Sequence, residues 1–126
     1  MAWVYLIIAG LLEIVWACVN GTLDKVDVRW SADASVCVVM ASKGYPGSYT
    51  TGLPISGLDD VDPGVVVFHA GTRRDAEGRV VTAGGRVLGV TAKDRTLEEA
   101  RRKAYANVER ISFEGAHYRR DIGVQE

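Results

Sequence analysis

The feature that most constrains this chain is an apolar run near its start, Ala2 to Val19, which only Glu13 interrupts. No Lys or Arg occurs before Lys25. Such a run is at the short end of what crosses a membrane as a helix, because a hydrocarbon core near 30 Å needs roughly 20 residues. Its aliphatic side chains would surround a helix on every side. The sequence therefore predicts an N-terminal helix that lies either in lipid or buried in protein.

Glu13 bears on these two alternatives. A carboxylate in the middle of a membrane helix is costly and is typically functional, whereas in a helix of a soluble protein Glu13 would face water. A secretory signal is not expected, because no basic segment precedes the apolar run and Glu13 divides it. Asn20 and Gly21 predict the end of the helix, since Gly adopts the left-handed conformation easily.

The charge balance of the whole chain limits what it binds. The 126 residues include 15 basic and 16 acidic side chains, which excludes a general nucleic-acid binder, because such proteins are strongly basic. Cys18 and Cys37 are too few for a disulfide framework or a four-ligand zinc site, so we expect two reduced, buried thiols. The expected location is the cytoplasm, with membrane association through the N-terminal helix as the alternative.

Beyond the apolar run, short apolar segments alternate with turns. This pattern predicts a small α+β domain with an antiparallel, barrel-like set of strands and a helix in its second half. The helix begins at a capping box, in which Thr96 accepts from the amide of Glu99, and runs to about Arg110. All three prolines fall within residues 42–64, which predicts a loop there. Strands are expected over residues 26–30, 36–40, 65–70, 79–82 and 86–91.

The most suggestive chemical feature is Arg86, which directly follows Gly84 and Gly85. Paired glycines within a strand pattern indicate either a bulge or close approach of the backbone to another group, and exposed amides beside a guanidinium suit a phosphate. A solvated arginine at the start of a strand explains the sequence equally well. His69 and His117 lack the spacing of metal ligands, so we predict structural histidines and no metal site.

Residues 1–17 resemble the first transmembrane helix of the small multidrug resistance transporters. In that family a membrane-embedded glutamate, which Glu13 matches, binds proton and cationic substrate in turn. Gly10 and Trp16 match positions that line the same site. The resemblance implies membrane contact through residues 1–19, and a single-span membrane protein as the alternative function.

The rest of the chain carries several motifs in a fixed order. They are Val38–Tyr49, Gly52 with Ile55, Val67–Thr72, Val81–Ala92 and Ala116–Gly123. Together, over about residues 18–126, they resemble the C-terminal domain of the phosphoribosylamine–glycine ligases, which are ATP-grasp enzymes of purine synthesis. The resemblance implies a small β-rich domain that closes over a ligase active site.

The ligase resemblance also implies roles for individual residues. Arg86, with Gly84 and Gly85, would approach the phosphate of phosphoribosylamine. His69 and the loop Lys43-Gly44-Tyr45 would line the same side of the site. No catalytic residue and no cofactor are expected in this chain.

The resembled ligase is longer than this chain. ATP and magnesium would be bound by its upstream ATP-grasp lobes, which together with its N-terminal domain are the expected partners, and we expect the chain alone to be inactive. The two resemblances overlap over Leu11 to Gly21. We therefore predict two domains, residues 1–20 and 21–126, and interpret the chain as a chimera.

Overall fold

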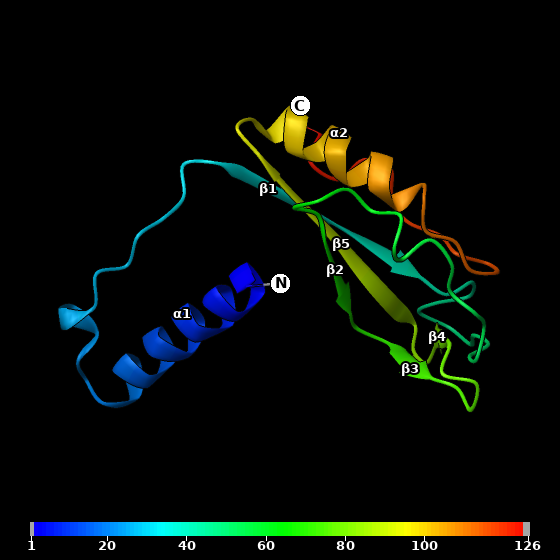
Figure 1. The fold of residues 1–126 in the computed structure, drawn as a ribbon, viewed down its shortest axis with the longest axis horizontal. Coiled ribbons are helices and arrows are strands. Elements are labelled where there is room, and N and C mark those ends of the chain that lie inside the picture. Colours follow the sequence, from blue (N-terminus) through cyan, green and yellow to red (C-terminus); the bar gives the residue numbers. More distant parts are fainter. Residues whose placement is uncertain (1, 125–126) are drawn as a thin grey trace. The chain divides into compact units, whose positions relative to one another are not determined.

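The computed structural model describes residues 2–124, with side chains from residue 10 onwards. The chain divides into two compact units, Met1–Ser31 and Ala32–Glu126, and each is described by itself. The first unit contains helix α1, Ala2–Val19, and the short 3₁₀ helix η1, Leu23–Lys25 (Figure 1). Gly21 follows α1 with a φ of +64°, the left-handed conformation expected at a helix end.

The strand predicted over residues 26–30 is absent from the described part of the chain, so this prediction is wrong. The segment is irregular, and Trp30 is 88% exposed. Alternating Val and Trp residues suit a half-buried strand, but a strand also needs a neighbour that completes its backbone hydrogen bonds. Both sheets of the structure are built from strands that begin after this segment.

The second unit is organised around a three-stranded antiparallel sheet in the order β1-β5-β2. The strands are β1, Ala34–Ala41; β5, Arg86–Asp94; and β2, Val66–His69. The central strand β5 places Val90 opposite Val38 of β1 and opposite Val67 of β2. The predicted apolar runs thus form strands, and β5 is longer than expected.

Helix α2, Leu97–Val108, packs on β1 and β5 (Figure 1). Its predicted capping box is confirmed: Thr96 Oγ1 accepts from the Glu99 amide (3.2 Å) and donates to Glu99 Oε2 (2.9 Å). Apolar residues spaced along one face of the helix are buried against the sheet. The core between helix and sheet contains Val36, Val38, Met40, Leu88, Val90, Ala92, Ala100, Ala104, Val108, Ile111 and Phe113.

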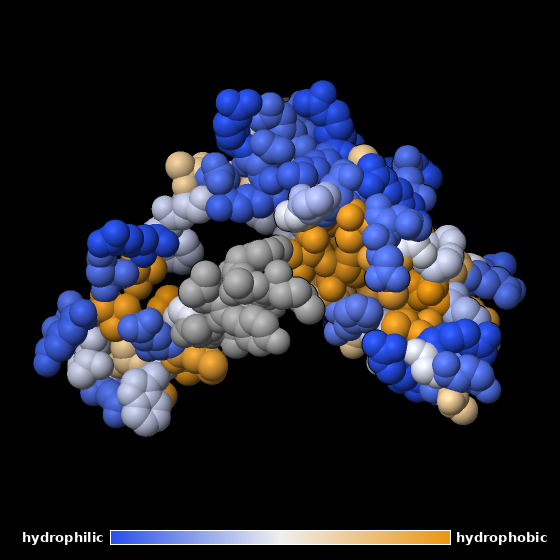
Figure 2. Space-filling view, viewed as in Figure 1, coloured by the Kyte–Doolittle hydropathy of each residue, from blue (hydrophilic) through white to orange (hydrophobic). Residues whose placement is uncertain are grey.

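The other face of the sheet carries exposed apolar side chains. Val39 of β1 is 42% exposed and Phe68 of β2 is 44% exposed, and Figure 2 shows hydrophobic residues gathered over these strands. Cys37 lies on this face, because side chains alternate along β1 and Val36 and Val38 point to the core. Cys37 and Cys18 are both free and exposed, so the prediction of buried thiols is wrong.

A second, two-stranded antiparallel sheet consists of β3, Thr72–Arg74, and β4, Val80–Thr82. The connection between them is a hairpin turn, closed by the bond from Gly78 N to Asp75 O (3.0 Å). The described strands therefore form two separate small sheets within an α+β unit. The expected barrel-like closure is not observed.

The segment after α2 is held in place by side chains of that helix. Tyr105 of α2 donates its hydroxyl hydrogen to Arg119 O (2.6 Å), and the same hydroxyl oxygen accepts from Ile122 N (3.1 Å). Arg101 Nε donates to Ile122 O (3.1 Å). In this segment the hydrogen-bond partners of Tyr105 and Arg101 are main-chain groups. Helix α2 therefore holds the backbone of the segment in place.

A buried asparagine on α2 fastens the loop that precedes β2. Asn107 is 0% exposed; its Oδ1 accepts from Asp62 N (2.7 Å), and its Nδ2 donates to Asp62 Oδ2 (3.1 Å) and Lys103 O (2.9 Å). Arg110 Nη1 donates to Asp62 Oδ1 (2.7 Å) and to Asp60 O (2.9 Å). The Asp62 carboxylate therefore accepts hydrogen bonds from the side-chain amide of Asn107 and from the guanidinium of Arg110 at the same time.

This network predicts a pH dependence of stability. The hydrogen bond from Arg110, followed by that from Asn107, lowers the pKa of Asp62 below its ordinary value of 3.8. The ionised carboxylate thus contributes stability that is present above pH 3.8 and is lost as pH falls through the lower folded pKa. We expect the difference in Tm between the unsubstituted chain and Asp62→Asn to narrow below pH 3.8 in thermal unfolding. A difference that stays constant to strong acid would contradict this account.

Candidate functional site

The candidate site is a hollow of about 600 Å³ at the end of the open sheet face, here called the Arg86 hollow. Arg86 lies at the start of β5, and Gly84 and Gly85 lie in the connection from β4 to β5. Together with Tyr45, from the loop after β1, they line the hollow. Its apolar lining includes Val39, Phe68 and Gly89.

The paired glycines have a structural reason that the sequence did not reveal. A Cβ on Gly85 would lie 2.0 Å from Cδ2 of Tyr45, so the ring occupies the space that any larger residue would need. A Cβ on Gly84 would lie 3.2 Å from the Cα of Gly71. The close approach predicted for this pair is therefore, at Gly85, an approach to the Tyr45 ring.

Ser42, a buried residue that the sequence analysis did not single out, joins the two loops of the hollow. Its Oγ donates to Gly84 O (2.9 Å) and its amide donates to Gly85 O (2.8 Å). Tyr45 N donates in turn to Ser42 O (3.1 Å). The sequence offered one signal for Ser42: it comes directly after an apolar strand and before the Lys43-Gly44-Tyr45 loop.

His69 lies at the end of β2, opposite Leu88 of β5. Its side chain is exposed, and Nδ1 lies 2.9 Å from Thr72 Oγ1. The next residues along the chain, Ala70 and Gly71, line the Arg86 hollow. The structure thus places His69 beside the hollow, in a hydrogen bond to a neighbouring hydroxyl.

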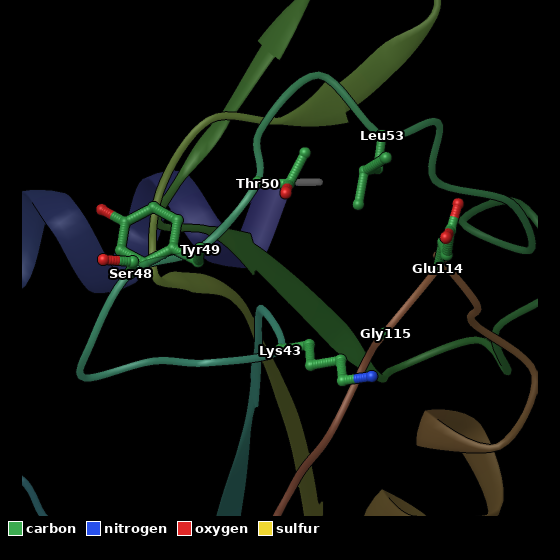
Figure 3. Close-up of a pocket in the computed structure, with 7 residues that line it drawn as sticks. All are labelled: Lys43, Ser48, Tyr49, Thr50, Leu53, Glu114 and Gly115. Atoms are coloured by element: carbon green, nitrogen blue, oxygen red, sulfur yellow. The ribbon is translucent and has the colours of Figure 1, made fainter.

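Lys43 lies in a different pocket, of about 390 Å³, here called the Lys43 pocket (Figure 3). Gly44 follows with a φ of +95°, and a Cβ there would lie 2.1 Å from Ser48 O, so Gly44 makes the tight turn of this loop. The structure thus brings Tyr45, Gly84, Gly85 and Arg86 together and separates Lys43 from them. Glu114 and Tyr49, which also line the Lys43 pocket, were missed, because no local pattern connects their loops to Lys43.

The residues of the transporter-like interpretation lie in the first unit. Glu13 is exposed, Trp16 is 71% exposed, and a Cβ on Gly10 would meet nothing within 4 Å. Among the residues that the structure describes, no helix is long and apolar enough to cross a membrane. The structure gives no support to a membrane-spanning helix built around Glu13.

Comparison with known proteins agrees with the motifs of the second unit. The family model of the phosphoribosylglycinamide synthetase C domain matches residues 35–125. The chloroplastic phosphoribosylamine–glycine ligase of Arabidopsis thaliana is 52% identical over 118 residues, which are 91% of this chain and 22% of that protein. That of Phenylobacterium zucineum is 52% identical over 117 residues, 91% of this chain and 28% of that protein.

A solved structure shows the same similarity. The crystal structure of phosphoribosylamine–glycine ligase from Thermotoga maritima matches 69% of this chain and 21% of its own, with a TM-score of 0.61 and 42% sequence identity. Both the sequence and the fold of this chain are therefore similar to part of a ligase.

These matches correct the interpretation of the N-terminal segment. A match over 91% of the chain necessarily includes residues of α1, so the similarity to the ligases extends into this helix. Neither the transporter resemblance nor the chimera is supported. The chain spans between 22% and 28% of the length of the two ligases compared, and it belongs to the phosphoribosylglycinamide synthetase C-domain family.

Proposed function

We propose that this chain acts as the C-domain part of a phosphoribosylamine–glycine ligase of purine biosynthesis, and that the Arg86 hollow receives the phosphate group of phosphoribosylamine. The observation that carries the proposal is the gathering of Tyr45, Gly84, Gly85 and Arg86 around one hollow. The names of the similar ligases supply the substrate. The domain would close over an active site that other parts of a ligase complete.

The chemistry of the hollow suits a sugar phosphate. The Arg86 guanidinium is exposed and can form charge-assisted hydrogen bonds with phosphate oxygens, which are stronger than bonds between neutral groups. Exposed Phe68 and Val39 give the hollow an apolar wall against which the carbon face of a ribose can pack. His69, beside the hollow, offers a hydrogen-bonding group at its edge.

ATP and magnesium, which the resemblance implies for the complete ligase, would be bound by its ATP-grasp lobes. Among the described residues no group of three or more His, Cys, Asp or Glu side chains could hold a metal ion. The proposal leaves the nucleotide and the metal to the ATP-grasp lobes and assigns this chain a role in binding phosphoribosylamine. Its proposed contribution is to bind and orient phosphoribosylamine and to shield the active site from water.

Complementation tests the proposal. The chain is mixed with a relative's ligase that has been truncated before its C domain, and glycine-dependent release of ADP is measured. We expect neither part to be active alone and the mixture to be active. A mixture as inactive as the truncated ligase, at concentrations at which the two proteins associate, would contradict the proposal.

The assignment of Arg86 is tested by its own variant. We expect Arg86→Gln to weaken binding of ribose 5-phosphate to the chain by roughly tenfold or more, since a hydrogen bond to a charged group contributes about 1.5–3 kcal/mol. Isothermal titration calorimetry measures the affinity. The matched control is Arg102→Gln on the exposed surface of α2, which should bind like the unsubstituted chain. Equal affinities for all three proteins would instead support a solvated arginine.

A further inference from the structure

The pairing between β1 and β5 ends in an incomplete pair beside the Arg86 hollow. Ser42 N donates to Gly85 O (2.8 Å), as in a hydrogen-bonded pair of an antiparallel sheet. Such a pair normally exchanges two bonds, so that Gly85 N would donate back to Ser42 O. Among the hydrogen bonds of the described residues, none has Gly85 N as its donor. Gly85, which is buried and lines the hollow, therefore has an amide without an acceptor.

The side chain of Ser42 explains why the second bond is missing. Ser42 Oγ donates to Gly84 O (2.9 Å), which is the carbonyl of the same peptide group that carries the Gly85 amide. In a trans peptide the carbonyl and the N–H point in opposite directions. By binding this carbonyl, Ser42 turns the Gly85 amide away from itself. Ser42 is 3% exposed, whereas both glycines line the hollow.

The glycine pair does not hold this orientation by itself. Rotation of the peptide between Gly84 and Gly85 changes ψ of the first residue and φ of the second, and neither has a Cβ that restricts these angles. The ring of Tyr45 fills the space beside Gly85, and Tyr45 N donates to Ser42 O (3.1 Å). The Ser42 hydroxyl is thus the group that fixes the direction of the peptide.

We infer that Ser42 is a positioning residue of the Arg86 hollow, which keeps the Gly85 amide available to an anionic ligand without contacting that ligand itself. The ligand class is a phosphate monoester, because the amide and the Arg86 guanidinium offer a neutral and a charged donor to phosphate oxygens. The inference rests on the proposed function and deepens it. Without the hydroxyl, Gly85 N can complete its pair with Ser42 O, and the ligand loses this donor.

Calorimetric titration of the full chain with ribose 5-phosphate tests the inference. We expect Ser42→Ala to weaken binding by roughly three- to tenfold, the effect of losing one hydrogen bond between a neutral donor and the ligand. Ser42→Thr keeps the hydroxyl and should bind like the unsubstituted chain. The matched control is Ser56→Ala, because Ser56 Oγ and Ser56 N likewise both donate to the main chain, at Ser112 O (3.3 and 2.9 Å), outside the hollow. This control should leave binding unchanged.

NMR of the backbone amides separates positioning from a general loss of stability. In the unsubstituted chain, ribose 5-phosphate should move the Gly85 amide hydrogen downfield more than that of Ala83, which already donates to Gly71 O (2.8 Å). In Ser42→Ala the Gly85 amide should exchange its hydrogen more slowly before ligand is added, because its pair is then complete. A substitution that only loosened the fold would make this exchange faster.

Three results would overturn the inference: Ser42→Ala binding as tightly as the unsubstituted chain, faster exchange at Gly85 in that variant, or a Gly85 resonance that ribose 5-phosphate does not move. If Ser42→Ala does not fold, the Gly85 resonance of the unsubstituted chain and the affinity of Ser42→Thr decide the question. Failure of the proposed function is separate. It would appear as an inactive mixture in the complementation assay, with Ser42-dependent binding of ribose 5-phosphate intact.

Discussion

Leu88→Ala is expected to lower the free energy of unfolding of the second unit by about 2–5 kcal/mol, the range for deleting a large aliphatic side chain from a core. Leu88 is 0% exposed and lies on β5 between Met40 of β1 and His69 of β2. Truncation removes apolar contacts with the core and leaves a cavity that the paired strands cannot close. Such a loss is a large part of the stability of an ordinary domain.

Urea unfolding of the full chain, followed by circular dichroism, measures this loss. The matched control is Val39→Ala in the same sheet, because Val39 is 42% exposed on the face away from α2. We expect this control to lower the free energy of unfolding by less than about 1 kcal/mol, as substitutions at exposed positions usually do. Equal losses at the two positions would show that the core does not lie between α2 and the sheet.

Asn107→Leu is expected to lower the free energy of unfolding by about 1–3 kcal/mol, because the amide of Asp62 is left without its hydrogen-bond acceptor. Leucine has nearly the same shape as asparagine, so the effect reports hydrogen bonding more than packing. The substitution also removes both bonds that Nδ2 donates, to Asp62 Oδ2 and to Lys103 O. We expect the Asp62 amide to exchange its hydrogen faster in the variant, measured by NMR.

Asn20→Leu is the control for this substitution. Asn20 also donates from Nδ2 to the carbonyl four residues earlier, Trp16 O (2.8 Å), but it is exposed and lies in the first unit. We expect it to leave unfolding of the second unit unchanged. If Asn107→Leu were equally harmless, the buried network would contribute nothing to stability.

Local sequence signals were sufficient where neighbouring residues decide the structure. The Thr96 capping box and the apolar spacing after it predicted α2, because a helix satisfies its hydrogen bonds within itself. The Asn20-Gly21 helix end was predicted because it depends on the conformational freedom of one residue, Gly21. Residues 26–30 show the limit: their alternation is typical of a strand, but whether a strand forms depends on a partner that local sequence does not specify.

The candidate site was predictable as a set of residues and not as an arrangement. Lys43 and Tyr45 are near neighbours in sequence, yet the turn at Gly44 sends one to the Lys43 pocket and the other to the Arg86 hollow. Gly85 was interpreted as making room for a ligand, whereas the space beside it is filled by the Tyr45 ring. Ser42 and Glu114 became visible only when loops distant in sequence were brought together.

The pairing of β1 with β5 has a consequence for the order of folding events. It joins Ala34 to Asp94 at one end and Ala41 to Arg86 at the other. The stretch of chain between the two partners of every pair therefore contains β2, β3, β4 and the long loop before them. Closing so large a segment costs chain entropy before any contact is gained, and topologies dominated by such distant pairs fold slowly. The β3–β4 hairpin and α2, whose bonds are local, can form first. Both loops of the Arg86 hollow meet only when β1 reaches β5, so the hollow is among the last features to assemble.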